Sequence, residues 1–259
     1  MLAATLRNTA IGIALMGLLT LSQLPGTSSV SYRDRFDVFL DLTNSPLTLL
    51  FALFVPILAG APTLVRLRER HLMLLHYRGR LGRALAGFFA SSAVIAGATG
   101  AAFALWPALV AFVVWPQRGD PNLFPEDYGL TTATALADAA QRSSYSQLLM
   151  YGEGVFVAAY VGWVALAAVA LAWLAVAMML LTPSLGLAVV APWVLFLAWS
   201  IGAQILGQPV AALSFSIFPS GLAQSEVFAA AAPGFVLLAL AVIAVAVAVL
   251  RRRAIPWAL

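Results

Sequence analysis

The chain has 259 residues, of which 63% are hydrophobic and 9% are charged, and its formal net charge is +4. Because ordinary globular domains hold roughly 25% charged residues, this composition excludes a water-soluble domain and predicts a membrane protein. The chain has no cysteine and no lysine, which excludes disulfides, thiolate metal sites, cysteine nucleophiles and the phosphate-binding lysine of a P-loop ATPase.

Six segments are apolar over the ~20 residues that a helix needs to cross a hydrocarbon core of ~30 Å. None of them alternates apolar and polar residues as a membrane-spanning strand would. The predicted fold class is an all-α polytopic membrane protein that forms one transmembrane domain over residues 1–259. The predicted spans are 6–24, 47–65, 84–114, 155–181, 185–206 and 233–250.

The connection between the first two predicted spans contains a short amphipathic pattern. Its apolar residues recur at helical spacing among charged neighbours. These residues are Tyr32, Phe36, Phe39 and Leu40. The pattern predicts a short helix that lies in the membrane interface on the external side. A contact with a substrate or a partner is the alternative interpretation.

Residues 66–83, between the second and third predicted spans, read RLRERHLMLLHYRGRLGR and hold six of the fourteen arginines. Charge of this density cannot lie in hydrocarbon, and the positive-inside bias places the segment on the cytoplasmic side. Six spans then put both termini on that side, together with ten of the fourteen arginines. The remaining arginines, in external loops, are Arg33, Arg35, Arg118 and Arg142.

A short helix within residues 66–83 would have an apolar side with basic residues around it and one acidic residue. The apolar side would hold Leu67, His71, Leu74 and Leu75, and the surround Arg68, Arg70 and Arg78, with Glu69 as the acid. One interpretation is a knob that docks on a cytoplasmic protein domain. The other is a topogenic cluster that anchors to anionic lipid. No interleaved aromatic platform accompanies the arginines, so a nucleic-acid partner is not expected.

The third predicted span is rich in small residues that allow close helix packing in lipid. Trp106–Pro107 predicts a kink, and Trp115–Pro116 predicts an exit at the interface. The long external loop that follows, 115–154, is turn-rich in its first half and alanine-rich in its second. A loop of this length without structure is uncommon, so we predict an external helical cap within residues 130–150.

The last two spans are separated by a polar stretch that is too irregular to cross a membrane. It follows residue 209 and is interrupted by Pro219-Ser220-Gly221. Irregular backbone at membrane depth is tolerated only against protein or water. We therefore predict two short re-entrant or interfacial helices before the sixth span.

The chemistry available in the predicted spans is limited. The only histidines, His71 and His76, lie in the 66–83 segment, which excludes an intramembrane protease with a histidine base and haem ligation by histidine. Ion-coupled carriers keep ionisable residues at mid-membrane, and these spans are nearly free of them. Glu153, at the outer end of the fourth span, is interpreted as an interfacial residue, with a proton relay as the alternative. No catalytic, cofactor or metal site is predicted, so energy must come from another chain.

The chain resembles the ABC-2-type permeases, the membrane subunits of type V ABC exporters. The resemblance covers the six spans, the internal termini, the basic connection, the large external loop and the broken helices before span six. Within 66–83 it lies in Glu69, the apolar run 72–75, Arg78 or Arg80, and Arg83. In that family such a segment forms a coupling helix that fits a groove on the ATP-binding subunit.

The resemblance implies a permease dimer, identical or paired with a sister subunit, in the bacterial inner membrane, with ATP and Mg²⁺ held by a separate subunit. Membrane lipid and an extracytoplasmic protein are further expected partners. The residues implied in coupling to the ATP-binding subunit are Arg68, Glu69, Arg70, His71, Leu74, Leu75, Arg78 and Arg80.

Three functions follow as hypotheses. The first is the non-enzymatic permease subunit of a bacterial ABC exporter. The second is a non-transporting subunit that transmits ATP-driven motion to an external partner through residues 115–154. The third is a stand-alone secondary carrier or channel.

Overall fold

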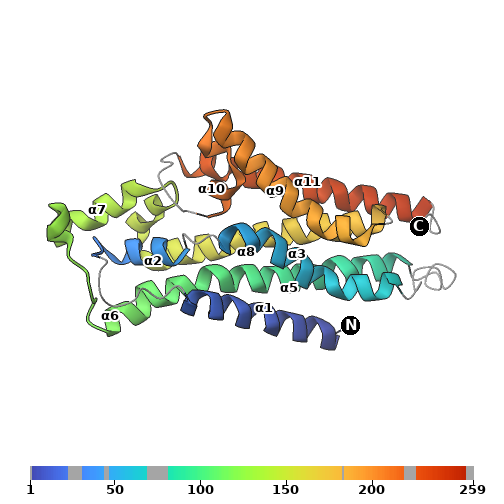
Figure 1. The fold of residues 1–259 in the computed structure, drawn as a ribbon, viewed down its shortest axis with the longest axis horizontal. Helices are drawn as coiled ribbons and strands as arrows, with labels where there is room; N and C mark the ends of the chain where they lie inside the picture. The colour runs from blue at the N-terminus through green and yellow to red at the C-terminus, as the bar shows by residue number, and fades with distance from the viewer. Residues whose placement is uncertain are drawn as a thin grey trace.

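The computed structural model describes residues 2–22, 31–43, 47–68, 81–182, 184–218 and 226–254. Within these residues the chain is helical and forms no named strand. Its long helices lie side by side in one elongated bundle (Figure 1). They are α1 (Leu2–Ser22), α3 (Leu47–Arg68), α5 (Leu81–Leu109), α8 (Glu153–Leu181), α9 (Leu185–Ile205) and α11 (Val227–Ala254).

Short helices connect and cover the long ones. Before α3 lies α2 (Arg35–Thr43), and α5 continues through the π-helix η1 (Val110–Val114) into α6 (Trp115–Gln117). The other short elements are η2 (Pro125–Tyr128), α7 (Thr132–Arg142), η3 (Ser146–Tyr151), η4 (Pro209–Ala211) and α10 (Leu213–Ile217). The predicted helix within 130–150 is therefore present as α7, and short helices precede α11 as expected.

Four helices of the described chain are long and apolar enough to cross a membrane. They are Leu81–Gln117, Glu153–Leu181, Gly186–Ile205 and Val227–Arg251. Helix α2 and Thr48–Leu64 of α3 pass the same test together as one span bent by 60°, while Ala3–Leu18 of α1 is a shorter apolar helix. The prediction of an all-helical fold with helices able to span a membrane is confirmed for the described residues, and the six-span count and the cytoplasmic side of the termini stay predictions.

The bundle has two ends, which differ in the elements that they bring together. At the terminal end, α1 and α5 begin and α3 and α11 end; at the opposite end, called the α7 end, lie α2, α6 and α7 (Figure 1). At the terminal end the helices extend beyond the predicted apolar segments, since α3 continues to Arg68 and α5 begins at Leu81. Arginine is a good helix former, so a helix does not have to stop where its apolar residues do.

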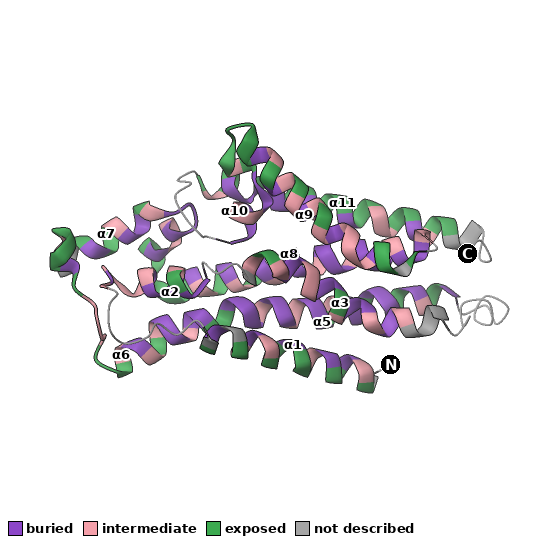
Figure 2. Ribbon diagram, viewed as in Figure 1, coloured by how far each residue is buried: buried purple, intermediate pink, exposed green. Residues whose placement is uncertain are grey.

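Helix α8 is the centre of the bundle and packs against α3, α5, α9 and α11. Figure 2 shows buried residues where the helices face one another and exposed ones along the outer sides of α1 and α11. Helices α5 and α8 approach each other closely at Gly100, where an added Cβ would lie 2.7 Å from the Ala168 Cβ and 3.0 Å from the Val164 carbonyl oxygen. The small residues of the third predicted span therefore permit close packing, as the sequence indicated.

Replacing Gly100 by alanine is expected to destabilise the protein by about 1–3 kcal/mol, because the added methyl group would overpack the α5–α8 contact. The control is Gly97→Ala in the same helix, where the nearest atom, a Val169 methyl carbon, would be 3.5 Å from the new Cβ. That change should be neutral or stabilising, since alanine favours a helix over glycine by up to ~1 kcal/mol. Thermal unfolding in detergent measures both, and equal melting temperatures would contradict the close contact.

Helix α2 is the short helix predicted for the first external connection, although it begins at Arg35, after Tyr32. Its apolar face is buried in the bundle, and its position in the membrane interface stays a prediction. The Phe39 ring lies 5.4 Å, between centroids, from the rings of Phe156 and Tyr160 in α8, in edge-to-face geometry. An amphipathic pattern identifies an apolar face, but protein and lipid can cover that face equally well.

The outer half of the third predicted span is continuous through Pro107. The helix widens to the π-helix η1 three residues later and returns to α-helical geometry at Trp115. π-Helical segments accommodate a local irregularity without ending a helix. The kink predicted at Trp106–Pro107 stays a prediction, and the local irregularity of this helix lies at Val110–Val114.

Candidate functional site

The coupling residues predicted from the sequence lie at the boundary of the described chain. Arg68 is the last residue of α3. Glu69, Arg70, His71, Leu74, Leu75, Arg78 and Arg80 lie outside the described residues, so their arrangement stays a prediction. The helices that flank these residues are described. Helix α3 ends and helix α5 begins at the terminal end of the bundle, where α1 also begins and α11 ends (Figure 1).

The α7 end carries an ion-pair network around Arg142, the last residue of α7. Its guanidinium donates to the carboxylates of Asp34 and Asp37, which lie just before and within α2. The Arg142 Nε also donates to Asp138, one turn earlier in α7, at 2.8 Å. The side chain of Arg142 is only 13% exposed and that of Asp34 only 15%. The network therefore joins the long 115–154 segment to the segment before α3.

Burial sets the electrostatics of this network. Desolvation raises the pKa of the Asp34 carboxyl above its ordinary value, and the adjacent Arg142 opposes that shift. A buried carboxylate is costly unless an opposite charge and hydrogen bonds compensate it. Arg142 supplies this compensation for Asp34 and for Asp37, and Asp37 also has Arg33 as a more distant partner, at 3.7 Å.

A second arginine, Arg35, links the start of α2 to the turn after α6 and to α8. It donates to both carboxylate oxygens of Asp120, at 3.1 and 2.9 Å, and lies 3.7 Å from Glu153. Asp120 reaches Arg35 from a turn in which it and Asn122 have positive φ angles of 51° and 62°. Aspartate and asparagine tolerate this conformation better than other side chains.

Glu153 lies at the position expected from the sequence, as the first residue of α8. Its side chain is 46% exposed and faces Arg35. This arrangement suits a residue at the end of a span. It is unlike the mid-membrane position of a proton relay.

The backbone of Tyr32 further fixes the two segments to each other. Its N–H donates to the Asn122 carbonyl at 2.8 Å, and its carbonyl accepts from the Phe124 N–H at 2.9 Å, forming an isolated parallel bridge. The Tyr32 hydroxyl donates to Asp41 at 2.9 Å. Burial raises the pKa of this hydroxyl, so it stays protonated and keeps its role as donor.

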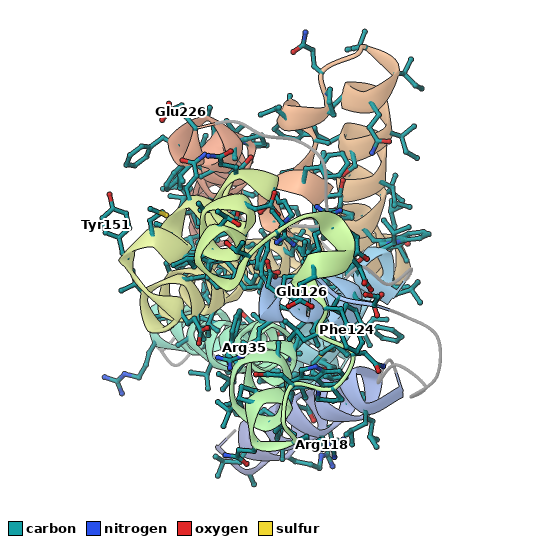
Figure 3. All side chains as sticks on the ribbon, turned by 90° about the vertical axis from the view of Figure 1, so that its left-hand side faces the viewer. Arg35, Arg118, Phe124, Glu126, Tyr151 and Glu226 are labelled. Carbon is teal, nitrogen blue, oxygen red and sulfur yellow. The ribbon has the colours of Figure 1, made fainter. Side chains whose placement is uncertain are left out.

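Sequence reasoning placed the charges of this network in external loops but did not predict that they pair. The available signal was the spacing of four between Arg33 and Asp37 and between Asp138 and Arg142, which favours ion pairs on a helix. Both pairs form, at 3.7 and 2.8 Å. Figure 3, which looks onto this end, shows the side chains gathered there from several elements.

A neutral hydrogen-bond cluster joins the α7 end to the helices before α11. The carbonyl oxygen of Ser216 in α10 accepts from the Tyr145 hydroxyl and from the Trp163 indole N–H, both at 2.6 Å. The Ser216 hydroxyl accepts from the Gly234 N–H of α11 at 3.1 Å. Ser216 thus connects Tyr145, the residue before η3, to α8 and α11.

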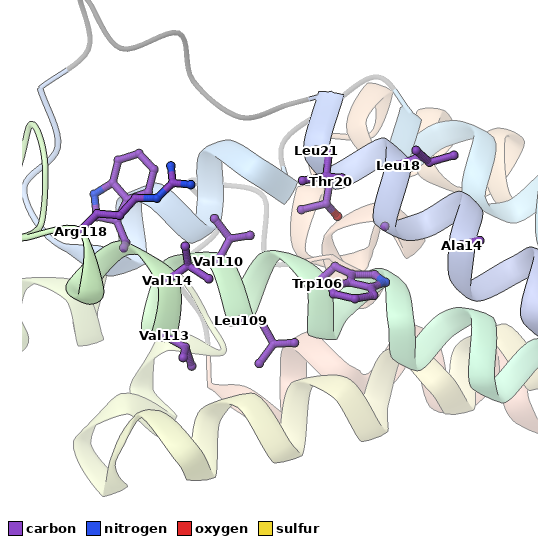
Figure 4. A pocket seen from close by; sticks show the side chains of 12 residues that line it. Ala14, Leu18, Thr20, Leu21, Trp106, Leu109, Val110, Val113, Val114 and Arg118 are labelled. Atoms are coloured by element: carbon purple, nitrogen blue, oxygen red, sulfur yellow. The ribbon is translucent and has the colours of Figure 1, made fainter.

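An apolar groove of about 670 Å³ runs between α1 and the α5–α6 span. Its wall is formed by Ala14, Gly17, Leu18, Thr20 and Leu21 of α1 and by Trp106, Leu109, Val110, Val113, Val114, Trp115 and Arg118 (Figure 4). The Trp106 ring lies against Gly17, where a Cβ would be 3.2 Å from it. Nothing in the sequence pattern indicated this groove.

Within the described residues no group of three or more histidine, cysteine, aspartate or glutamate side chains could hold a metal ion. Comparison with protein-family models, with curated proteins and with solved structures found no match to this chain. The class of protein therefore follows from the helices, four of which can cross a bilayer, and it is that of a helical membrane protein.

Proposed function

We propose that the chain is the permease subunit of a bacterial ABC exporter. Two permease subunits, identical or sister, would form the translocation path in the inner membrane. A separate ATP-binding subunit would dock on residues 66–83 from the cytoplasmic side and hold ATP and Mg²⁺.

The observation that carries this proposal is the separation of charge between the two ends. The arginine-rich 66–83 segment connects α3 to α5 at the terminal end, where α1 begins and α11 ends (Figure 1). At the α7 end three arginines, Arg33, Arg35 and Arg142, are paired with carboxylates instead. Because basic residues remain on the cytoplasmic side, this distribution favours a cytoplasmic terminal end that presents residues 66–83 to a soluble partner.

The chain's own chemistry favours an external source of energy. It has no lysine for a P-loop, and Glu153, the candidate for a proton relay, lies at the end of its helix. Transport driven by this chain would then depend on movement imposed by another subunit.

A second candidate, the non-transporting transmission subunit, is favoured by the network around Arg142 and Arg35. These ion pairs hold the 115–154 segment to α2 and α8. Because the segment is held to the bundle, it would move with the bundle and could transmit that movement to an external partner. A stand-alone carrier or channel has no comparable observation in its favour.

The test of the proposed function is isolation of the tagged chain from its native membranes in mild detergent, followed by mass spectrometry of the bound subunits. We expect a protein with ATP-binding motifs in near-equal amount, absent from a control isolation with an unrelated tagged membrane protein. Substrate-stimulated ATPase activity in lipid would then distinguish export from transmission. Solute flux driven by an ion gradient with the purified chain alone would contradict the proposal.

A further inference from the structure

The groove between α1 and the α5–α6 span has the size of a ligand site and an apolar interior. Its volume of about 670 Å³ lies within the ~300–1,000 Å³ typical of small-molecule sites. It lies towards the α7 end, where α5 passes through η1 into α6 (Figure 4).

The polar side chains in the wall, apart from Arg118, already have hydrogen-bond partners. The indole N–H of Trp106 donates to the Ile13 carbonyl at 3.3 Å, and that of Trp115 donates to the Pro121 carbonyl at 3.0 Å. The Thr20 hydroxyl donates to the Met16 carbonyl of its own helix at 3.1 Å. A polar ligand group inside the groove would lose its hydrogen bonds to water without replacement. The part of a ligand that enters must therefore be hydrocarbon.

Arg118 lies at the α6 end of the groove and differs from the other arginines at that end of the bundle. Arg33, Arg35 and Arg142 form ion pairs, whereas Arg118 forms none with any carboxylate in the described part of the chain, and it is exposed. A guanidinium binds phosphate oxygens through two parallel hydrogen bonds. The groove thus combines an apolar interior with one available positive charge at its mouth.

Trp115 indicates the depth of the groove in a bilayer. It lines the wall where α6 begins, and tryptophan is enriched where the hydrocarbon meets the headgroups. Arg118 follows Trp115 by three residues and would lie at headgroup level. A ligand with a phosphate at that level and a hydrocarbon chain directed inward is a phospholipid.

We propose that this groove binds an anionic phospholipid, with one acyl chain between α1 and α5 and its phosphate on Arg118. Helix α1 packs mainly on α5 and α3. The acyl chain would fill the space that the side chains of α1 and α5 leave open between these two helices. This inference concerns a membrane lipid, and it does not depend on the proposed transport function.

The experiment is a titration of the delipidated protein in detergent with phosphatidylglycerol or phosphatidylcholine of identical acyl chains, read by native mass spectrometry. For the unmodified protein we expect one tightly bound phosphatidylglycerol and weaker binding of phosphatidylcholine. Arg118→Gln should lower the affinity for phosphatidylglycerol by about tenfold, to that for phosphatidylcholine, because it removes the charged hydrogen bonds. Val114→Trp, which fills the groove, should lower the binding of both lipids.

Two controls lie outside the groove. Arg251→Gln removes an exposed arginine at the end of α11, and Val236→Trp adds bulk to an exposed position of α11; neither should change lipid binding. Unchanged melting temperatures would show that all four variants are folded. The proposal is overturned if Arg118→Gln keeps the preference for phosphatidylglycerol or if Val114→Trp binds lipid normally. A second copy of the chain cross-linked through the groove in place of lipid would also overturn it.

Discussion

On the proposed function, replacing Glu69 and Arg78 together by alanine is expected to lower ATP-driven transport by at least about tenfold in vesicles that contain both subunits. Both residues lie in the segment that would dock on the ATP-binding subunit. A hydrogen bond to a charged group contributes ~1.5–3 kcal/mol, and ~1.4 kcal/mol corresponds to a factor of ten in binding. The loss should appear as weaker co-purification of the ATP-binding subunit and as ATP hydrolysis no longer linked to transport.

The matched control for this prediction is Arg251→Ala, which removes an exposed arginine near the end of α11 without touching residues 66–83. It should leave both co-purification and transport unchanged. The double variant should elute and melt as the unmodified protein does, since residues 69 and 78 lie between α3 and α5. If the double variant binds the ATP-binding subunit and transports normally, the docking role of this segment is wrong.

The second large effect is expected at Arg142. Replacing it by methionine should destabilise the protein by about 3–5 kcal/mol, because breaking a buried ion pair from one side leaves uncompensated charge. Here Asp34 and Asp37 would both lose their main counter-charge, and their mutual repulsion would add to the loss. The melting temperature in detergent should fall by on the order of 10 °C, at ~2–4 °C per kcal/mol for a chain of this size.

Two variants test the specificity of this effect. Arg118→Met removes an exposed arginine at the same end of the bundle, and its effect should stay within ~0.5 kcal/mol. Arg142→Lys keeps the positive charge but loses the forked set of N–H donors. Its stability should therefore lie between that of the unmodified protein and that of Arg142→Met. If Arg142→Met and Arg118→Met lower the melting temperature equally, the network does not stabilise the fold.

The positions of the long helices could be predicted because each is a nearly continuous apolar run. The predicted segment 155–181 agrees with α8 within two residues, and the expected close packing of the third span appears at Gly100. The helix ends could not be predicted as well. Composition indicates where hydrocarbon ends, whereas a helix can continue past its apolar residues, as α3 does to Arg68.

The candidate sites were less accessible to sequence reasoning. The four-residue spacing of Asp138 and Arg142 indicates one ion pair, but the partners Asp34 and Asp37 lie more than a hundred residues away in the chain. Only the packing of α2 against the bundle brings them together. The groove beside Arg118 likewise depends on how α1 crosses α5. The role of residues 66–83 rests on composition and family resemblance and stays a prediction.

The contacts of Ser216 limit how the bundle can change shape. A carbonyl oxygen has two lone pairs, and Tyr145 and Trp163 occupy both. Sliding of α11 along α8 would therefore have to break the Gly234–Ser216 hydrogen bond or pull Ser216 away from Tyr145 and Trp163. These bonds oppose sliding between the helices and favour joint movement of α8, α10 and α11.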